Sequence, residues 1–369
     1  MKNTFGSAVT VTIFGESHGP AVGAVLDGLA AGLPVDGEFI ARQMDKRRAK
    51  PGGLSTARAE ADQVRFLSGV WNGRTTGTPL ALMIENQNTR PGDYAAGAGL
   101  ARPGHADWAA HVKYGGFEDW RGGGHFSGRV TAALTAAGAV CRGVLAAKGV
   151  LAATHIREAA GVPDAPFAAQ PGALRAQLEA LAGQGGFPVL REAAGEEMQA
   201  AIRAAGAEGD SVGGILETAA AGLPAGIGEP FFDSVESTLA HLLFSVPAVK
   251  GVEFGAGFGF AGMRGSEAND PLRLEDGRIT TATNHNGGVN GGVANGMPLV
   301  LRSCVKPTPS IYKPQRTVDL ASGAEGELRI QGRHDPCILH RAAVVQTAAV
   351  CIGLLDLCTQ RFGTLWQAE

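Results

Sequence analysis

The sequence has no basic excess and no paired cysteines. Its 369 residues carry 32 Lys and Arg against 35 Asp and Glu, which gives a formal net charge of −3 and a pI near 6.3. Nucleic-acid-binding proteins and cationic membrane-surface proteins need a basic excess, so we expect neither partner. The five cysteines are odd in number and form no CxxC pair, which argues against disulfide scaffolds and cysteine-rich zinc sites. We therefore expect free thiols in a cytoplasmic protein without a metal site.

The sequence also has no long apolar run and no secretion signal. Its longest apolar stretch, 342–355, is too short to cross a membrane and contains Gln346 and Thr347. The first residues, MKNTFGSAVTVTIF, do not show the charged and then apolar pattern of a signal segment. Strands and helices do not alternate strictly, so a doubly wound parallel sheet is not favoured.

Glycine, by contrast, is abundant. The 55 glycines are about twice the usual share, and they show no period of three, which excludes a collagen-like rod. With 44% hydrophobic residues and a mean hydropathy of +0.03, the chain can bury a large core. Neither a linker-like composition nor an internal repeat divides it, so we expect a single domain over residues 1–369.

Short strand-like runs bounded by glycine and fewer, longer helical patterns predict an α+β fold. Strands are predicted at 8–14, 22–26, 80–84, 214–217, 251–254 and 299–301. Helices are predicted at 128–148, 172–182, 196–205, 233–243 and 336–357. The first and last of these helices are apolar on nearly every face, which predicts that each is covered on two sides.

Two motifs carry familiar patterns in an unfavourable context. GESHG at 15–19 matches the GxSxG nucleophile elbow of serine hydrolases, but the residues after it are strand-like where the elbow needs a helix. A serine hydrolase using Ser17 remains an alternative, and a non-catalytic flavin- or phosphate-binding protein is a second. GFGFAG at 257–262 matches the dinucleotide fingerprint, but a polar loop follows it, so it carries no prediction.

Three histidines lie in turns bounded by glycine or proline and beside charged groups. His18 in GESHG and His105 in RPGHAD are candidates for acid–base chemistry, whereas His334 in GRHDPC is equally explained by a loop hydrogen bond. Asp335 precedes Pro336, which fits a cap at the start of a helix. The same place also suits a carboxylate that orients a proton donor.

The segment RGGGHFSGR at 121–129 leads into an apolar helix. Free backbone amides there, with Arg121 and Arg129 beside them, predict an anion site, and a flexible loop capped by Ser127 is the alternative. Further arginines lie in or beside the glycine-rich loops: Arg47, Arg48, Arg58, Arg90, Arg102, Arg333 and Arg341. In a chain of negative net charge they predict a pocket for a small polyanion. KPTPS at 306–310 offers a cation and hydroxyls suited to a ring or a phosphate tail.

Eight collinear segments together resemble the chorismate synthase family over essentially the whole chain. They are GESHG at 15–19, SGVWNGRTTGTPL at 68–80, RPGHAD at 102–107, KYG and DWRGGG within 113–124, GDSVGG at 209–214, KGVEFG at 250–255, KPTPSI at 306–311 and GRHDPC at 332–337.

The resemblance implies a lyase that catalyses the last step of the shikimate pathway. This step is the 1,4-anti elimination of phosphate from 5-enolpyruvylshikimate-3-phosphate, which gives chorismate and requires reduced FMN without net redox change. The implied fold is a β-α-β sandwich with central apolar helices between antiparallel sheets, in a homotetramer. Whether the chain reduces its own flavin with NADPH stays open.

The resemblance also implies roles for individual residues. His18 would protonate the reduced flavin with Ser17 as its neighbour, His105 would protonate the departing phosphate, and Asp335 would assist removal of the C6 proton. Substrate-anion contacts are implied for Arg48, Arg129 and Arg341. FMN contacts are implied for His125, Phe126, Ser127, Gly291, Lys306, Pro307, Thr308, Pro309, Ser310 and Arg333, and Ser127 is counted with the catalytic residues as well.

One segment departs from the family pattern. Where many members read GGRSSARET, this chain reads GGHFSGRVT at 123–131. His125 replaces a permanent cation, and Val130 removes the glutamate that would complete a capping box with Ser127. Glycine is concentrated in four turns, and we expect these turns to line one site. They lie at 15–19, 92–104, 115–128 and 284–296.

Overall fold

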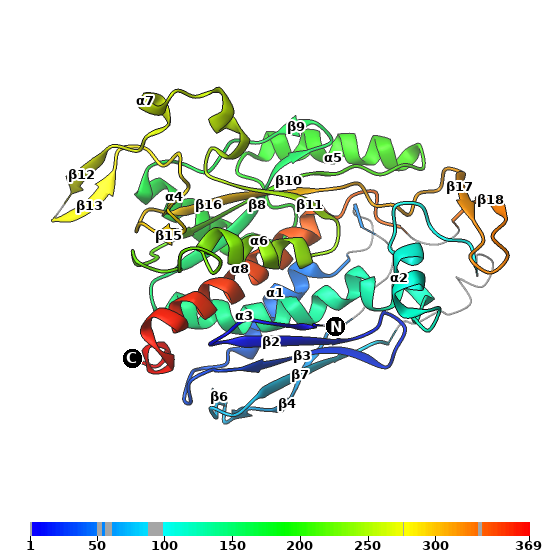
Figure 1. The fold of residues 1–369 in the computed structure, drawn as a ribbon, viewed down its shortest axis with the longest axis horizontal. Helices are drawn as coiled ribbons and strands as arrows, with labels where there is room; N and C mark the ends of the chain where they lie inside the picture. Colours follow the sequence, from blue (N-terminus) through cyan, green and yellow to red (C-terminus); the bar gives the residue numbers. More distant parts are fainter. Residues whose placement is uncertain (1, 50–53, 56–60, 88–98, 276, 331–333) are drawn as a thin grey trace.

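Two antiparallel five-stranded sheets enclose a layer of helices (Figure 1). The computed structural model describes all residues except 1, 50–53, 56–60, 88–98, 276 and 331–333. The first sheet has the strand order β1 (Thr4–Phe5), β2 (Thr10–Gly15), β3 (Ala21–Asp27), β7 (Leu80–Glu85) and β4 (Val64–Ser68). The second has the order β11 (Val249–Phe254), β16 (Leu299–Val305), β10 (Gly214–Ala221), β8 (Leu151–Ala159) and β9 (Val162–Pro163).

Alternating apolar residues fix the register of the first sheet. On β3, Val22 and Ala24 are buried and pair with Ile84 and Leu82 of β7, which are buried as well. A shift by one residue would turn these side chains away from the helices, so burial of this face selects the observed pairing.

Helices α3 (Thr131–Ala147) and α8 (Leu339–Phe362) pack against each other in the middle layer, with α1 (Gly37–Arg47) and α6 (Val235–Ser245) beside them. A Cβ at Gly138 of α3 would lie 2.4 Å from Cβ of Ala348 in α8, so the two backbones come unusually close. Helices α4 (Pro171–Gly183) and α5 (Glu192–Ala207) lie on the outer side of the second sheet.

The polar residues of the apolar stretch bond α8 to the second sheet. Nε2 of Gln346 donates to Oγ1 of Thr218 on β10 at 2.9 Å. Oγ1 of Thr347 lies 2.7 Å from Oγ1 of Thr154 on β8. Because every one of these buried groups has a partner, the polar side chains do not disturb the core.

Two helices in the described part of the chain are long and apolar enough to cross a membrane, Gly128–Ala147 and Leu339–Phe362. The most apolar 18 residues of the second are entirely buried inside the fold, and two-thirds of the corresponding stretch of the first are buried. Their apolar surface is therefore explained by the core of the sandwich.

The remaining elements lie at the edges. They are β5 (Val70–Trp71), β6 (Arg74–Thr75), α2 (Asp107–Tyr114), η2 (Arg121–Phe126), η3 (Gly128–Val130), η4 (Gly257–Gly262), α7 (Gly265–Ala268), β12 (Leu272–Glu275), β13 (Arg278–Thr281), β14 (Val289–Asn290), β15 (Val293–Ala294), β17 (Gln315–Val318), β18 (Glu325–Leu328) and η5 (Thr364–Gln367). The β12–β13 hairpin extends away from the body of the molecule (Figure 1).

The α+β sandwich with central apolar helices confirms the predicted fold. Helix α8 begins at Leu339 and not at 336, so the prediction that Asp335 caps it is wrong; the N-cap is Ile338, which makes no side-chain cap. GESHG is followed by strand β3, so the strand–turn–helix geometry of a hydrolase elbow is not formed.

Candidate active site

Three consecutive glycines form the centre of the candidate site. Gly122, Gly123 and Gly124, within η2, have φ values of 58°, 86° and 52°, conformations that other residues rarely adopt. A Cβ at Gly122 would lie 2.3 Å from Cε1 of His18, and one at Gly123 would lie 2.8 Å from Cε1 of His105. Only glycine lets the backbone pack this closely on both imidazoles. The two histidines predicted from the sequence therefore meet at adjacent residues of one loop.

His18 is buried in the turn between β2 and β3. The backbone N–H of neighbouring Ser17 donates to the carbonyl oxygen of Gly124 at 3.0 Å. From the other side, Nδ2 of Asn86 donates to two carbonyl oxygens of the turn at 2.8 and 3.0 Å. The turn is thus fixed by the glycine run and by the residue that follows β7.

His105 is held by the first residue of α2. Its Nδ1 lies 2.6 Å from Oδ1 of Asp107, and Nε and Nη2 of Arg102 donate to the same carboxylate at 2.8 and 2.7 Å. Burial alone would raise the pKa of Asp107, but hydrogen bonds from His105 and Arg102 outweigh it and hold this pKa well below its ordinary value. An ionised carboxylate at this distance requires a proton on Nδ1, so Nε2 is the nitrogen left for proton transfer.

A cavity of about 810 Å³ opens beside His105, between η2, α2 and the β17–β18 hairpin. Its wall includes three of the predicted site residues, His105, His125 and Phe126. Four further aromatic side chains line it: Phe14, Tyr114, Phe117 and Trp120. Its volume and aromatic wall suit one flat molecule of cofactor size.

His125 and Ser127 follow the glycine run directly. Nδ1 of His125 lies 2.8 Å from the carbonyl oxygen of Gly15 and donates to it, which fixes the ring against β2. Oγ of Ser127 accepts from the backbone N–H of Arg129 at 3.2 Å and caps η3, a cap that the alternative interpretation of this segment included. Where many family members have a permanent cation, this chain therefore places the imidazole of His125 at the cavity wall.

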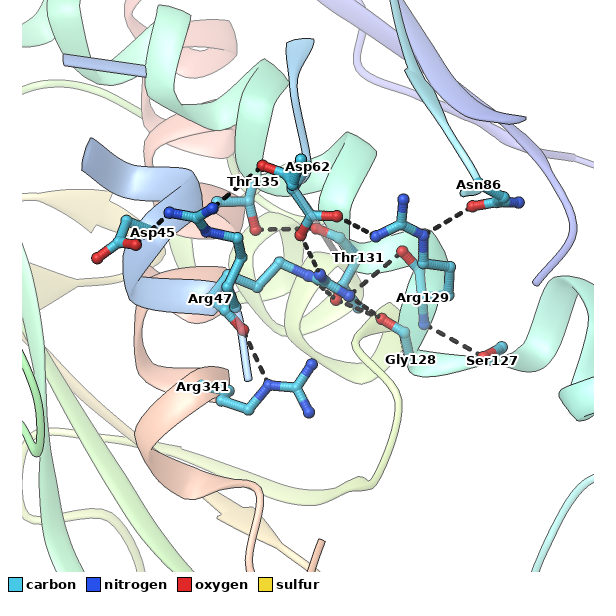
Figure 2. A network of polar contacts seen from close by, with 12 residues as sticks. Asp45, Arg47, Asp62, Asn86, Ser127, Gly128, Arg129, Thr131, Thr135 and Arg341 are labelled. Atoms are coloured by element: carbon cyan, nitrogen blue, oxygen red, sulfur yellow. Dashed lines mark hydrogen bonds and ion pairs between the residues drawn. The ribbon is translucent and has the colours of Figure 1, made fainter. Parts of the chain in front are cut away.

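Two buried arginines meet at Asp62 (Figure 2). The side chain of Asp62 is 1% exposed, and those of Arg47 and Arg129 are each 5% exposed. Nη1 of Arg47 lies 2.9 Å from Oδ2 of the carboxylate, and Nη1 of Arg129 pairs with Oδ1. Arg47 ends α1 and Arg129 precedes α3, so one carboxylate joins the ends of two helices.

Arg341 and Asp335 adjoin this network. Nη1 of Arg341 lies 2.7 Å from Oδ2 of Asp335. Nε of Arg341 donates to the backbone oxygen of Arg47 at 2.8 Å (Figure 2). Arg48 instead pairs with Asp45 within the partly exposed end of α1. Of the two neighbouring arginines, the buried network therefore contains Arg47, whereas the resemblance points to Arg48.

Comparison with known proteins decides the family. The family model described as chorismate synthase matches residues 9–359. This chain belongs to the chorismate synthase family. It is similar to proteins named chorismate synthase from Archaeoglobus fulgidus, at 47% identity over 96% of each chain, and from Chitinophaga pinensis, at 46% identity over 96% of each chain. A solved crystal structure of chorismate synthase matches the fold with a TM-score of 0.75 and 26% identity, covering 97% of this chain and 94% of the other.

Membership of the chorismate synthase family makes the chain an enzyme, a lyase of the shikimate pathway. The cofactor segment implied by the family, 306–310, lies against the loop before α2. Nζ of Lys306 donates to the carbonyl oxygen of Gly104, and a Cβ at Gly104 would lie 3.3 Å from Cβ of Pro309. Oγ1 of Thr308 is buried without a hydrogen-bond partner among the described residues. A buried hydroxyl without a partner is costly, so this atom fits a bound ligand.

Gly291, another contact implied by the chorismate synthase resemblance, lies apart from the rest. It sits in the turn between β14 and β15, far along the molecule from α2 (Figure 1). We expected four glycine-rich loops to line one site. The described parts of three of them, 15–19, 92–104 and 115–128, lie together at the glycine run. The fourth, 284–296, lies apart from them within one chain, so the expectation is wrong for this loop. Arg333, and with it Arg58 and Arg90, lies outside the described residues.

Asp62 and Asn86 were not predicted as site residues from the sequence. Asn86 directly follows β7 and lies two residues after the predicted strand 80–84, so its place near a strand end was a usable signal for a site residue. Asp62 follows no motif, and its role depends on two arginines that are 15 and 67 residues away in the sequence. Only the folded chain brings these three charges together.

Proposed function

We propose that this enzyme eliminates phosphate from 5-enolpyruvylshikimate-3-phosphate in a 1,4-anti elimination, which gives chorismate and requires reduced FMN without net redox change. The observation that carries the proposal is the packing of His18 and His105 on adjacent glycines. The arginine network lies beside them, because Asn86 links Arg129 to the His18 turn. The substrate carries two carboxylates and a phosphate, so acid–base groups next to fixed cations match its chemistry.

The residues present fit a flavin. The cavity beside His105 has an aromatic wall, and the hydroxyl of Thr308 is buried without a partner among the described residues. The residues proposed to hold FMN are His125, Phe126, Ser127, Lys306, Pro307, Thr308, Pro309 and Ser310, with Arg333 from outside the described part. When bound, reduced FMN supplies an electron transiently while the phosphate leaves.

His105 is the proposed acid for the leaving phosphate. Since Asp107 holds Nδ1–H, the imidazolium presents its Nε2–H as the remaining donor. A positioned acid of this kind contributes roughly 10²- to 10⁴-fold to a rate.

Asp335 is the proposed group for removal of the C6 proton. Its carboxylate is oriented by Nη1 of Arg341 at 2.7 Å, which keeps one oxygen in a fixed direction. Arg129 and Arg341 are proposed as substrate-anion contacts, and Arg48 stays a prediction. His18, with Ser17 beside it, would hold a proton at the flavin.

We further propose a cytoplasmic homotetramer. Large apolar side chains are exposed on two separate loops, with Phe231, Phe232 and Phe258 exposed by 88%, 90% and 86%. The extended β12–β13 hairpin exposes Leu272 and Leu274 as well. Such surfaces suit contacts with further copies of the chain, and assembly would also bring a partner's 284–296 loop toward the site.

The proposed activity is tested by anaerobic incubation of the purified protein with 5-enolpyruvylshikimate-3-phosphate and dithionite-reduced FMN. We expect phosphate and chorismate in equal amounts, and none with oxidised FMN. Replacing dithionite by NADPH shows whether the chain reduces its own flavin. If reduced FMN gives no phosphate, the proposed function is wrong.

A further inference from the structure

We propose that Asp62 is a positioning residue of the site. Its buried carboxylate sets the direction of the Arg129 guanidinium and, through it, the place of the turn that carries His18. That Asp62 positions Arg129 and the His18 turn follows from the geometry alone. That Asp62 affects substrate binding rests on the proposed function.

Burial and charge make Asp62 the group on which both arginines depend. The carboxylate uses one oxygen for Arg47 and the other for Arg129, and all three side chains are almost completely buried. Removing one partner from a buried ion pair leaves a charge without compensation, which a folded chain avoids by moving the group. A change at Asp62 therefore reorients a guanidinium.

Both arginines have contacts apart from Asp62. Nε of Arg47 donates to Oγ1 of Thr131 at 3.1 Å, and its Nη2 donates to the carbonyl oxygen of Gly128 at 2.9 Å. Nε of Arg129 donates to Oδ1 of Asn86 at 2.8 Å, and its Nη2 donates to the carbonyl oxygen of Glu85 at 3.2 Å. Because Arg129 is bonded to Asn86, a reorientation of Arg129 reaches the His18 turn.

The direction of Arg129 reaches the His18 turn through a single side chain. Nε of Arg129 donates to Oδ1 of Asn86 at 2.8 Å, and Nδ2 of Asn86 donates to the carbonyl oxygens of Glu16 and Gly19 on either side of His18. The amide of Asn86 is oriented by these contacts at both ends (Figure 2 shows Asp62, Arg129 and Asn86). Loss of the Arg129 contact frees the amide to rotate and loosens the turn.

Asp62→Asn is the variant that isolates this role. Asp62 has a φ of 49°, a left-handed conformation that asparagine tolerates well, so the backbone is preserved. The shape of the side chain also stays the same. The change replaces one carboxylate oxygen by an NH₂ group, which faces an N–H donor of an arginine instead of accepting from it.

Asp356→Asn is the matched control. Asp356 is equally buried, in α8, and its carboxylate accepts the backbone N–H groups of Ser7, Ala8 and Val9 at 2.7 to 3.1 Å. Its hydrogen-bond partners among the described residues are these three and Gln360, none of them a proposed site residue, so the same substitution there affects the fold and not the site.

The test compares crystal structures and steady-state kinetics of the full-length wild type and both variants. In Asp62→Asn we expect Arg129 to leave Asn86, and KM for 5-enolpyruvylshikimate-3-phosphate to rise roughly 10- to 100-fold, with kcat reduced less than about threefold. In Asp356→Asn we expect a lower melting temperature and an unchanged KM. An Arg129 that keeps its contact with Asn86 in Asp62→Asn, or a KM that does not change, overturns the proposal. A wild type that releases no phosphate instead counts against the proposed function, and the crystal structures then decide the role of Asp62 by themselves.

Discussion

The pairing of His105 with Asp107 fixes which imidazole nitrogen can transfer a proton. The carboxylate accepts from Nδ1 at 2.6 Å and is itself held by Arg102. Nη2 of Arg102 also lies 3.0 Å from Nδ1 of His105, so the arginine contacts the histidine directly and keeps the carboxylate ionised and in place. The protonation of His105 depends on three side chains that lie within six residues of sequence. The turn RPGHAD could therefore be recognised from the sequence.

Asp107→Asn tests this pairing through activity and through stability against pH. We expect kcat to fall roughly 10- to 100-fold, because the amide no longer fixes the proton on Nδ1. The pKa of Asp107 is lowered in the folded protein, so its stabilising contribution is present above the pKa of the unfolded chain, about 3.9, and is lost as the pH falls through the lower folded value. The difference in free energy of unfolding between wild type and variant should be constant from pH 8 to about 5 and shrink below about pH 4 in denaturant titrations. A difference that grows toward acid would contradict this account.

The sequence did not predict which of the neighbouring residues Arg47 and Arg48 is buried. Adjacent residues of a helix point about 100° apart, so only one of the two can enter the core at that place. Helix α1 was not predicted, and without it the sequence offers no way to decide which arginine faces inward. The structure buries Arg47 and leaves Arg48 with Asp45.

At the scale of elements, the glycine run of η2 sets the distance between His18 and His105, the proposed acid–base groups. Each of its left-handed residues places backbone where a side chain would collide with a neighbouring residue, and at two of them that neighbour is a proposed acid–base group. The run therefore acts as a spacer that consists of backbone alone. It keeps His18 and His105 close enough for both to contact one bound molecule.

Gly123→Ala tests the spacer. The new methyl group would lie 2.8 Å from Cε1 of His105 in a backbone conformation that strains alanine, so we expect kcat to fall at least roughly tenfold. Gly143→Ala in α3 is the control, since no atom lies within 4 Å of its added Cβ and alanine favours a helix interior. Normal turnover in Gly123→Ala, measured by phosphate release, would show that the spacer is not needed.

Helices and strands could be predicted from the sequence where a single hydrophobic pattern extends over the whole element. Helices α3 and α8 are apolar all round and were predicted as covered on two sides, which the sandwich confirms. Strand β8, LAATHIREA, was missed because its alanines favour helices, and pairing with β9 and β10 overrides that preference. Helix α8 begins after its predicted start, and Asp335, which was expected to cap it, pairs with Arg341, a contact that sequence spacing alone did not reveal.

At the scale of the whole molecule, one chain holds most of the site and leaves the 284–296 loop apart from it. The exposed phenylalanines at 231, 232 and 258 are costly for a chain that stays alone in water. Both observations are consistent with the proposed homotetramer, whose contacts would cover the phenylalanines.

Light scattering of the purified protein tests this assembly. We expect a mass four times that of the 37.8 kDa chain. Exchange of Phe231 and Phe232 for serine should shift the mass toward smaller species, because the buried apolar area of the contact is lost. A wild type that elutes as a monomer at all concentrations would contradict the proposed homotetramer.

His105 is proposed as the proton donor to the phosphate that leaves the substrate. The most direct measurement is anaerobic phosphate release by wild type and His105→Ala, with reduced FMN and 5-enolpyruvylshikimate-3-phosphate at saturation. We predict a rate lower by roughly 10²- to 10⁴-fold in the variant, with its affinity for FMN retained. A variant that releases phosphate at a near-normal rate would contradict the account.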